Sequence, residues 1–501
     1  MNVCLRRPAD AGRDSAQILV PDRIRVDVAI IGSGPGGSVT GAMLARAGRD
    51  VAIFEEGAWV RPEDTIPFSP DEMSRKLRNN GQTMALGKAM VAFWEGRCLG
   101  GGSEVNRGLY HRPSPEVVAA WAAQGAVDAL SPEDLTARAG VCEGTARISL
   151  LPGPAPRVSQ KLAEGAAALG WHHMEVPRLF VYDDDWQASP QTGRKQSMSN
   201  TFIPDFVAAG GRLYTGTRVR RIARQDGGWR LQASANGPDG RPRPVEIRAR
   251  KVFVACGATQ TPALLRRSGI TRRVGDSLRF HTMIKAVARF AEPLADDNPL
   301  DPVHQVKEFD PRFSLGASVS TAATVTFGLS DRIDILPHVR DDWRHLGVYY
   351  AQTTGGCGTV RVLPGFDDPL IRSETRANDL ADLAAGLRSL CESLFAAGAI
   401  EVYPNLRGGP TLRSPDDLDL LPDILAPDRL SLSTLHLLAS CPMGSDPRRS
   451  VTDSFGRVHD AEDLYLADSA MLPGPTVVNP QGTIMAMAHR NAEHFLEATV
   501  R

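Results

Sequence analysis

Three glycines near the N-terminus, Gly32, Gly34 and Gly37, have the spacing that brings a backbone close to phosphate groups. In this pattern the first glycine permits a tight turn, the second lets the backbone approach a pyrophosphate, and the third lets a helix pack closely on a strand. The N-terminus of that helix adds unpaired N–H groups and a partial positive charge. Glu55 follows Gly37 by 18 residues, at the place of an acid that accepts hydrogen bonds from a ribose. Together the four residues predict a dinucleotide site.

The segments on either side of these residues have the patterns needed to position them. An apolar run over residues 25–31 predicts a strand that ends at the glycines, and an Ala/Leu-rich stretch after them predicts a helix. A second apolar run, residues 51–54, predicts the strand that carries Glu55 at its end. Strand, glycine turn, helix, strand and acid is the order of a Rossmann-like fold. The alternative is a glycine-rich turn without a ligand, because 47 glycines in 501 residues produce chance matches.

The composition indicates a protein without charge-driven partners. A net charge of −1 gives no reason to expect nucleic acid or an anionic membrane surface as a partner. Seven scattered cysteines without a CxxC pair argue against a disulfide framework or a zinc site, and they favour a reducing compartment. No apolar run approaches the roughly 18 residues of a membrane span, and residues 1–23 predict a loose polar extension rather than an export signal. We therefore expect a cytoplasmic protein without a metal site.

The rest of the chain mixes helical and strand-like patterns. Helices are expected at residues 116–124, 132–139, 160–169 and 379–397, a strand and turn at 211–222, and strands at 229–234, 245–249, 251–256, 324–329, 347–352 and 358–363. Residues 237–240 are expected to form the turn of a hairpin, and residues 180–186 form an aromatic and acidic patch.

Four segments of the chain are rich in motifs. They are the N-terminal glycine pattern, GRCLGGGSEVNRG at 96–108, GATQTPALLRRSGI at 257–270, and a C-terminal block with HLLASCPMG at 436–444, GRV at 456–458, LYLAD at 464–468 and VNPQGTI at 478–484. In this order they resemble the glucose-methanol-choline (GMC) family of FAD-dependent oxidoreductases. The GGGSxVN loop is similar to that of cholesterol oxidases and long-chain alcohol oxidases. Two positions depart from the family pattern: Thr271 replaces a glycine, and HLLAS replaces HxxGT.

The resemblance implies an α/β protein made of two interleaved domains. A Rossmann-like FAD-binding domain would be discontinuous, and a substrate-binding domain with inserts would be built on an antiparallel sheet with flanking helices. We expect the FAD-binding domain at residues 24–112, 190–285 and 430–501, and the substrate-binding domain at residues 113–189 and 286–429. The active site would lie between the two domains, where binding clefts tend to form.

His436 and Asn479 are the expected catalytic pair, because they match the two active-site positions of the family. An imidazole titrates near neutral pH and can accept a hydroxyl proton within hydrogen-bond reach, so His436 is the expected general base. An asparagine cannot act as a base, but its amide can orient the hydroxyl or stabilise a developing alkoxide. The structural alternatives are a buried histidine at 436 and a turn-capping role for Asn479 before Pro480. His281 resembles a further family position, for which we expect a structural role.

The same resemblance assigns further residues to the cofactor. Asn106 would lie near the flavin ring, Asp468 near the ribityl or pyrophosphate, and Val219 beside the adenine. The remaining cofactor-binding residues would be Arg97, Gly101, Gly102, Ser103, Asn479 and Pro480, beside Gly32, Gly34, Gly37 and Glu55. Some relatives attach the flavin through a histidine where this chain has Val105, so we expect FAD to be bound without a covalent link.

These assignments predict FAD-dependent oxidation of an alcohol to a carbonyl, by hydride transfer to the flavin. A flavin-bearing lyase on the same fold, an NAD(P)H-linked flavoprotein reductase and a protein that only carries FAD are the alternatives. The substrate would be a small-molecule alcohol, with the loop motif favouring bulky or apolar ones, although Gln481 stands where the cholesterol oxidases have an aromatic residue. The electron acceptor, O₂ or another compound, is open.

Overall fold

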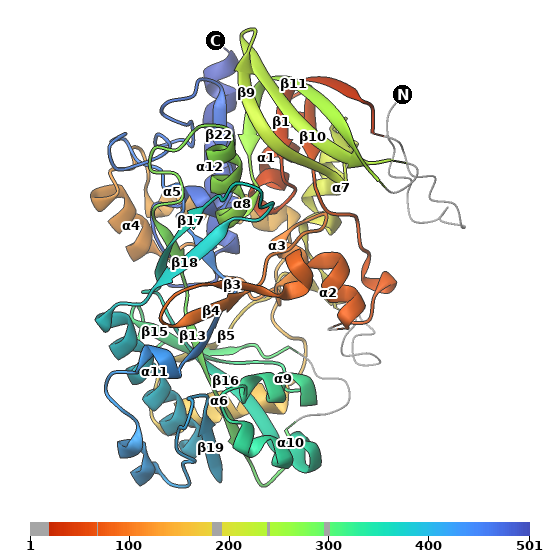
Figure 1. Cartoon of the computed structure of the whole chain (residues 1–501). Coiled ribbons are helices and arrows are strands. Elements are labelled where there is room, and N and C mark those ends of the chain that lie inside the picture. The colour runs from red at the N-terminus through yellow and green to blue at the C-terminus, as the bar shows by residue number, and fades with distance from the viewer. Residues whose placement is uncertain (1–19, 68, 183–192, 238–240, 295–300, 501) are drawn as a thin grey trace.

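The computed structural model describes residues 20–67, 69–182, 193–237, 241–294 and 301–500. Among these residues the strands form sheets of seven, nine, four and two strands. The seven-stranded sheet and the nine-stranded sheet occupy opposite ends of the molecule in Figure 1, and the four-stranded sheet lies between them.

The seven-stranded sheet combines segments from three distant parts of the chain. Its strands are β1 (Arg23–Ile31), β2 (Val51–Phe54), β8 (Arg212–Tyr214), β9 (Thr217–Gln225), β10 (Gly228–Asn236), β11 (Pro242–Val254) and β22 (Leu464–Leu466), in the order β8-β2-β1-β11-β10-β9 with β22 beside β11. β11 pairs in parallel with β1 and β22 but antiparallel with β10. β2 and the C-terminal parts of β1 (residues 28–31) and β11 (residues 252–254) are wholly apolar and buried, as expected of strands covered on both faces.

Helices cover this sheet, and the helix that follows β1 packs against the last helix of the described chain. α1 (Pro35–Arg46) packs against α12 (Gln481–Val500) and α7 (Phe202–Ala208), and α5 (Pro132–Thr145) packs on α12. Val39 and Leu44 of α1 share one core with Ile30 and Ile53 of the sheet and Phe495 of α12. The first and last elements of the chain are thus parts of one packed layer (Figure 1).

The nine-stranded sheet is mainly antiparallel and has helices on both faces. Its strands are β3 (Thr83–Ala85), β4 (Met90–Phe93), β5 (His173–Glu175), β13 (Met283–Arg289), β14 (His304–Val306), β15 (Phe313–Ala317), β16 (Leu346–Thr353), β19 (Glu401–Pro404) and β20 (Ser431–Thr434). α6 (Arg157–Ala168) and α11 (Ala377–Ala396) pack on one face, and α9 (Ala322–Gly328) and α10 (Leu336–Asp342) on the other. On β13, Ala286 and Ala288 pack in the core beneath α6 and α11, while Val287 points to the other face and packs in the core beneath α9 and α10.

The four-stranded sheet connects the two larger sheets. It contains β12 (Leu278–Phe280), β17 (Cys357–Arg361), β18 (Leu370–Glu374) and β21 (Leu437–Leu438). Two residues separate β12 from β13, and two separate β20 from β21, so both pairs of strands leave one sheet and enter the other at the same place. The remaining elements are α2 (Pro70–Lys76), α3 (Gly102–Val105), α4 (Pro115–Gln124), α8 (Gly257–Arg267), β6 (Phe180–Val181) and β7 (Arg194–Lys195).

Most of the expected elements are confirmed, including the α/β class with a Rossmann-like sheet, an antiparallel sheet and flanking helices. The strand expected at residues 324–329 is wrong, because this segment lies in α9. Thr321 caps that helix by accepting a hydrogen bond from the Thr324 N–H, and this local bond outweighs the β-branched composition. The two strands expected at 245–249 and 251–256 form the single strand β11.

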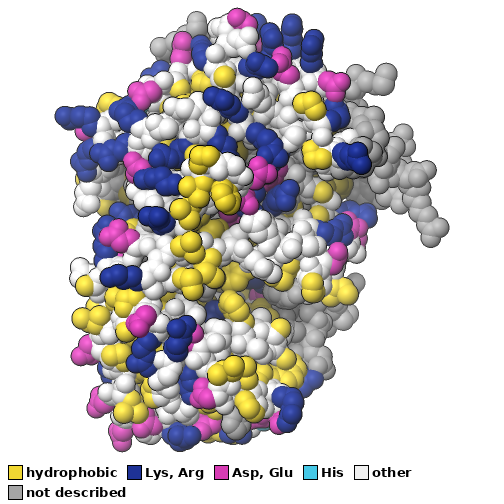
Figure 2. All heavy atoms as spheres, in the orientation of Figure 1, with side chains coloured by type: hydrophobic (Ala, Val, Ile, Leu, Met, Phe, Trp, Pro, Cys, Tyr) yellow, Lys and Arg dark blue, Asp and Glu magenta, His cyan; other side chains and the backbone are white. Residues whose placement is uncertain are grey.

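Three of the expected features lie partly outside the described residues: the N-terminal extension at residues 1–19, the patch at 183–186 and the turn at 238–240. Within the described ranges, no helix combines the length and apolar character required to cross a bilayer. Hydrophobic side chains gather near the middle of the face in Figure 2. The exposed large hydrophobic residues of β3, β4 and their connection are Met84, Leu86 and Met90.

Candidate active site

The glycine turn between β1 and α1 has the geometry that its spacing predicts. Gly32 has a φ of +104°, and a Cβ atom there would lie 2.3 Å from the Ala255 carbonyl oxygen. A Cβ atom on Gly37 would lie 2.2 Å from the Gly32 oxygen. At Gly34, by contrast, an added Cβ atom would meet nothing within 4 Å, and no side chain caps the helix that follows. The backbone at Gly34 therefore faces open space at a helix N-terminus, which suits a phosphate group.

The second glycine loop packs directly against this turn. A Cβ atom on Gly101 would lie 3.0 Å from the Gly34 Cα, while one on Gly102 would meet nothing within 4 Å. Ser33 joins the two loops, because its hydroxyl donates to Glu55 Oε2 at 2.7 Å and accepts from the Gly100 N–H at 2.9 Å. Gly34 and Gly102 thus border open space from two loops held together, and the residues present fit a pyrophosphate.

Glu55 is buried at the end of β2, with 6% of its surface exposed. Its Oε2 accepts from the Ser33 N–H at 3.0 Å and from the Ser33 hydroxyl, and its Oε1 accepts from the Gly57 N–H at 2.8 Å. A carboxylate offers about four acceptor positions, so one position on Oε1 stays available to a ribose hydroxyl. Burial raises the pKa of Glu55, and the hydrogen bonds from Gly57 and Ser33 oppose that rise.

Asp468 is placed on the other side of the glycine turn. Its Oδ2 accepts from the Gly257 N–H at 2.9 Å and from the Thr261 hydroxyl, and its Oδ1 accepts from the Ala470 N–H at 2.7 Å. The backbone before it is so close to α1 that a Cβ atom on Gly36 would lie 1.8 Å from the Ala467 oxygen. The Asp468 carboxylate therefore fixes the start of α8 to the segment after β22, whose backbone packs against α1.

The remaining cofactor candidates surround the same region with different degrees of burial. Val219 lies on β9 opposite Ala233 and is partly buried. Arg97 is about half exposed, with its Nε 3.9 Å from Glu56 Oε2. Ser103 is buried, and its hydroxyl donates to the Gly100 oxygen and accepts from the Met198 N–H.

Asn106 and the start of α12 are joined by a side-chain hydrogen bond. The Asn106 amide donates to Gln481 Oε1 at 2.6 Å. Pro480 precedes α12 and accepts from the Ile484 N–H at 2.9 Å through its carbonyl. The flavin loop is therefore fixed to the segment that carries Asn479.

His436 meets His281 at the junction of the sheets. β12 and β21 are antiparallel with Phe280 opposite Leu437, and the next pair in this register is His281 and His436. The two Nδ1 atoms are 3.0 Å apart, with the rings nearly perpendicular at 89°. Among the described residues the Nε2 atom of His436 has no hydrogen-bond partner, and its side chain is only partly buried. This ring is thus fixed on one side and free on the other.

Asn479 lies in a hydrogen-bonded row that reaches β14. Its Oδ1 accepts from the Gln305 amide at 3.4 Å, and Gln305 Oε1 is 3.0 Å from His111 Nε2. The Nδ2 group of Asn479 has no partner within the described part of the chain. The backbone of Thr476, three residues before Asn479, is close enough to His281 to affect the pKa of its imidazole. The segment that carries Asn479 is therefore next to the histidine pair.

The imidazoles of this region are neutral at pH 7. Burial, with a smaller contribution from the positive charge of Lys307, lowers the pKa of His436 to about 4. Burial likewise lowers the pKa of His111 to about 3 and that of His281 well below its usual value. A neutral imidazole has one free lone pair, so each ring can accept a proton.

The structure thus brings the predicted residues into two neighbouring groups. Gly34, Gly101, Gly102, Ser103 and Glu55 border the glycine loops, while His436 and Asn479 lie with residues that sequence reasoning missed. These are Gln305 and Lys307, for which the sequence offers no motif, and His281 in its contact with His436. No group of three or more His, Cys, Asp or Glu side chains in the described ranges is placed to hold a metal ion.

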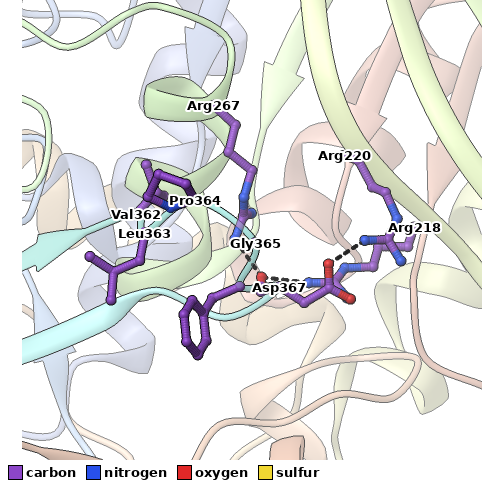
Figure 3. A pocket seen from close by; sticks show the side chains of 9 residues that line it. Arg218, Arg220, Arg267, Val362, Leu363, Pro364, Gly365 and Asp367 are labelled. Atoms are coloured by element: carbon purple, nitrogen blue, oxygen red, sulfur yellow. Dashed lines mark hydrogen bonds and ion pairs between the residues drawn. The ribbon is translucent and has the colours of Figure 1, made fainter.

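A separate pocket of about 500 Å³ lies between β9, α8 and the turn after β17. In Figure 3, Arg218, Arg220 and Arg267 converge on Asp367 from these elements. None of the residues that line it belongs to the two groups above.

Sequence comparison identifies the family. The N-terminal GMC oxidoreductase profile matches residues 73–283, and the C-terminal profile matches residues 358–488. The chain belongs to the GMC oxidoreductases. It is 35% identical to an uncharacterized GMC-type oxidoreductase of Sinorhizobium fredii, over 96% of either chain. GMC oxidoreductases are flavoproteins, and membership therefore implies an FAD cofactor.

More distant relatives have named activities. This GMC oxidoreductase is 25% identical to a long-chain-alcohol oxidase of Arabidopsis thaliana, over 93% of this chain and 66% of the relative. The crystal structure of pyridoxine 4-oxidase from Mesorbium loti superimposes with a TM-score of 0.71 at 17% identity, covering 94% of this chain and 99% of the other. At 17% identity, the likeness to pyridoxine 4-oxidase supports the fold alone.

Proposed function

We propose that this protein uses FAD to oxidise an alcohol to a carbonyl, with His436 as the general base. The observation that carries the proposal is a neutral imidazole whose Nδ1 is held by His281 and whose Nε2 has no partner in the described part of the chain. A base needs a lone pair directed at the proton that it accepts, and a fixed ring supplies one without reorganisation.

The bound FAD would supply the hydride acceptor. His436 would take the hydroxyl proton on Nε2 as the carbon–hydrogen bond breaks. The Nδ2 group of Asn479 would donate to the substrate oxygen and stabilise the charge that develops there. The Gln305 amide donates to the Oδ1 atom of Asn479 at 3.4 Å, so the orientation of the Asn479 side chain depends on a residue of β14.

The cofactor would be held by the two glycine loops and by Glu55. Gly34 and Gly102 leave room for the pyrophosphate, and Glu55 has one oxygen position left for the ribose. Asn106 is placed by Gln481 beside the second loop, where the flavin ring is expected. Asp468 would act mainly by fixing the start of α8 to the segment after β22, because three protein groups already donate to its oxygens.

The flavin would be bound without a covalent link, because Val105 offers no nucleophile. Precipitation of the purified protein with acid is expected to leave intact FAD in the supernatant. Flavin that stays with the pellet after washing would contradict the proposal. The free FAD standard treated in the same way is the control for losses during precipitation.

The substrate would be a bulky or apolar alcohol. This proposal rests on the GGGSxVN loop and on the similarity to the long-chain-alcohol oxidase. A panel of long-chain, sterol-like and aromatic primary alcohols, mixed anaerobically with the enzyme, is expected to bleach the flavin for at least one class. Exposure of the bleached enzyme to air then tests whether O₂ reoxidises the flavin and is thus the electron acceptor. Bleaching by an alcohol excludes a purely lyase role, and bleaching by NADH instead would favour the reductase.

His436→Ala tests the base directly. We expect the rate of flavin reduction in anaerobic stopped flow to fall by roughly 10²–10⁴-fold, the usual contribution of a general base. The wild-type rate should also decline as the pH falls through about 4, where His436 becomes protonated, and the variant should lack this decline. FAD content should be unchanged, because the glycine loops lie elsewhere. A variant that reduces its flavin at the wild-type rate would move the base to another residue.

A further inference from the structure

Among the described residues, His281 is the side chain that forms a hydrogen bond with the Nδ1 atom of His436. It is fully buried, and it has this place because β12 and β21 are paired in antiparallel register. The backbone adds to the pairing, since the His281 N–H donates to the His436 carbonyl at 3.3 Å. On the other side, the His436 N–H donates to the Thr434 hydroxyl at 3.1 Å. The position of both rings is thus set by main-chain bonds and not by the side chains alone.

A bond between two Nδ1 atoms requires one ring to donate and the other to accept, because a neutral imidazole carries a single proton. If His281 donates, the proton of His436 is on Nε2, and that nitrogen cannot accept a proton from a substrate. If His436 donates, its Nε2 has a free lone pair. The direction of this one hydrogen bond therefore decides whether His436 can be a base.

The proposed function requires the second arrangement. His436 can take a substrate proton on Nε2 only when its own proton is on Nδ1, and the Nδ1 atom of His281, 3.0 Å away, is then the acceptor. The Nε2 atom of His281 is buried and has no hydrogen-bond partner among the described residues, so this atom does not compete for the contact with His436. With its proton on Nε2, His281 presents the lone pair of Nδ1 to His436.

We propose that His281 is a positioning residue that accepts a hydrogen bond from the Nδ1–H of His436 and so leaves the Nε2 lone pair of His436 free for the substrate hydroxyl. This inference rests on the proposed function, in which His436 is the base. The arrangement resembles the use of a hydrogen-bond acceptor to hold a catalytic histidine in one tautomer, but here a neutral imidazole replaces the carboxylate.

Burial, and after it the positive charge nearby, keeps both rings neutral. Lys307, at the end of β14, disfavours a proton on His436, His281 and His111 alike. Asp310 lies 3.6 Å from Lys307 and moderates its charge. A carboxylate in place of His281 would attract a proton to His436, whereas a neutral acceptor fixes the tautomer without protonating the base.

The tautomer can be measured without substrate. In FAD-loaded protein labelled with ¹⁵N-histidine, long-range ¹H–¹⁵N correlation at pH 7 distinguishes a proton on Nδ1 from one on Nε2, and His436→Gln assigns the signal. We expect His436 to carry its proton on Nδ1. In His281→Leu the signal should move to the Nε2–H form, while in His281→Asn the side-chain oxygen can still accept and should retain the Nδ1–H form.

Flavin reduction gives the second readout. His281→Leu should slow it by about 10²-fold, since a misplaced or wrongly protonated base costs at least that much, and His281→Asn should restore most of the rate. His345→Leu, which removes a partly exposed histidine that contacts the Phe290 carbonyl, is the control and should leave the rate unchanged.

A wild-type His436 with its proton on Nε2 would overturn the proposal, as would equal losses in the Leu and Asn variants. The wild-type spectrum decides the matter even if His281→Leu fails to fold. Failure of the proposed function is distinguishable: His436→Ala would then reduce its flavin normally, whatever tautomer the spectrum shows.

Discussion

At the scale of single residues, the burial of His436 has two opposing effects. Enclosure by protein lowers its pKa to about 4, which makes it a weaker proton acceptor than an exposed imidazole. The same enclosure keeps the ring unprotonated across the neutral range, so nearly every molecule has its base ready. A fixed orientation of the ring and an amide donor nearby would then compensate for part of the rate that the low basicity costs.

Asn479→Ala is expected to slow flavin reduction by roughly 10- to 10³-fold, because it removes one donor to the developing oxyanion. Gln305 would lose its partner as well, so Gln305→Ala is the matched variant that disturbs orientation but leaves the Asn479 amide in place. Its loss should be smaller. The double variant His436→Ala/Asn479→Ala should lose less than the product of the single losses, since both groups act on one oxygen. Additive losses in stopped flow would contradict a shared oxygen.

The sequence predicted His436 and Asn479 but not the residues that hold them. Both belong to motifs whose order resembles a known family, and such motifs are local. The contact between His281 and His436 joins residues 155 positions apart and depends on the register of two short strands. Gln305 lies on a three-residue strand without a recognisable pattern. Contacts of this kind come from tertiary pairing, which composition and spacing do not encode.

At the scale of elements, the glycine turn offers a matched pair of substitutions. Gly34→Val should leave the protein folded, because the φ of −65° at Gly34 suits any residue and an added Cβ atom meets nothing within 4 Å. It should nevertheless abolish FAD retention by filling the space for the phosphates. Gly36→Val should instead destabilise the fold, since its Cβ atom would lie 1.8 Å from the Ala467 oxygen.

The readouts are the flavin-to-protein absorbance ratio and the midpoint of thermal unfolding. Full flavin occupancy in Gly34→Val would mean that this turn does not contact the cofactor. An equal loss of stability in both variants would show that Gly34 is needed for packing rather than for ligand approach.

The elements themselves were predicted well where pattern and local bonds agree. β2 has the same bounds as the predicted strand, because an apolar run between two turns has no other local option. α9 was predicted as a strand because it contains β-branched residues, which favour strands. The hydrogen bond from the Thr324 N–H to the Thr321 hydroxyl starts a helix there instead. The limits of the two interleaved domains remain a proposal.

At the scale of the whole molecule, the buried histidines couple stability to pH. His436 and His111 have a pKa of about 4 and about 3 in the folded protein but an ordinary value near 6.5 when unfolded. Between these values the unfolded chain binds more protons, so the free energy of unfolding falls as the pH drops from about 6.5 toward 4. Each histidine contributes a slope of about 1.4 kcal/mol per pH unit in that range.

Urea unfolding of the FAD-loaded protein at pH 5 and at pH 7 measures this coupling. Buried carboxyls such as Glu55, whose pKa is raised, oppose the effect, so the comparison is between wild type and His436→Gln. The pH dependence of the free energy of unfolding should be weaker in His436→Gln, by up to about 1.4 kcal/mol per pH unit. An identical dependence in His436→Gln and wild type would mean that His436 is not desolvated in the folded state.

The position of β22 has a consequence for how the protein is made. β22 pairs with residues 252–254 of β11, and until residues 464–466 have left the ribosome this edge of an apolar strand lacks its neighbour. α12 completes the same layer later still. The apolar edge at residues 252–254 therefore lacks its partner strand for some two hundred residues of synthesis, and an unpaired strand edge is a template for association with other chains. Chaperone dependence in the cell, rather than the stability of the finished enzyme, would then limit the yield of C-terminally shortened versions.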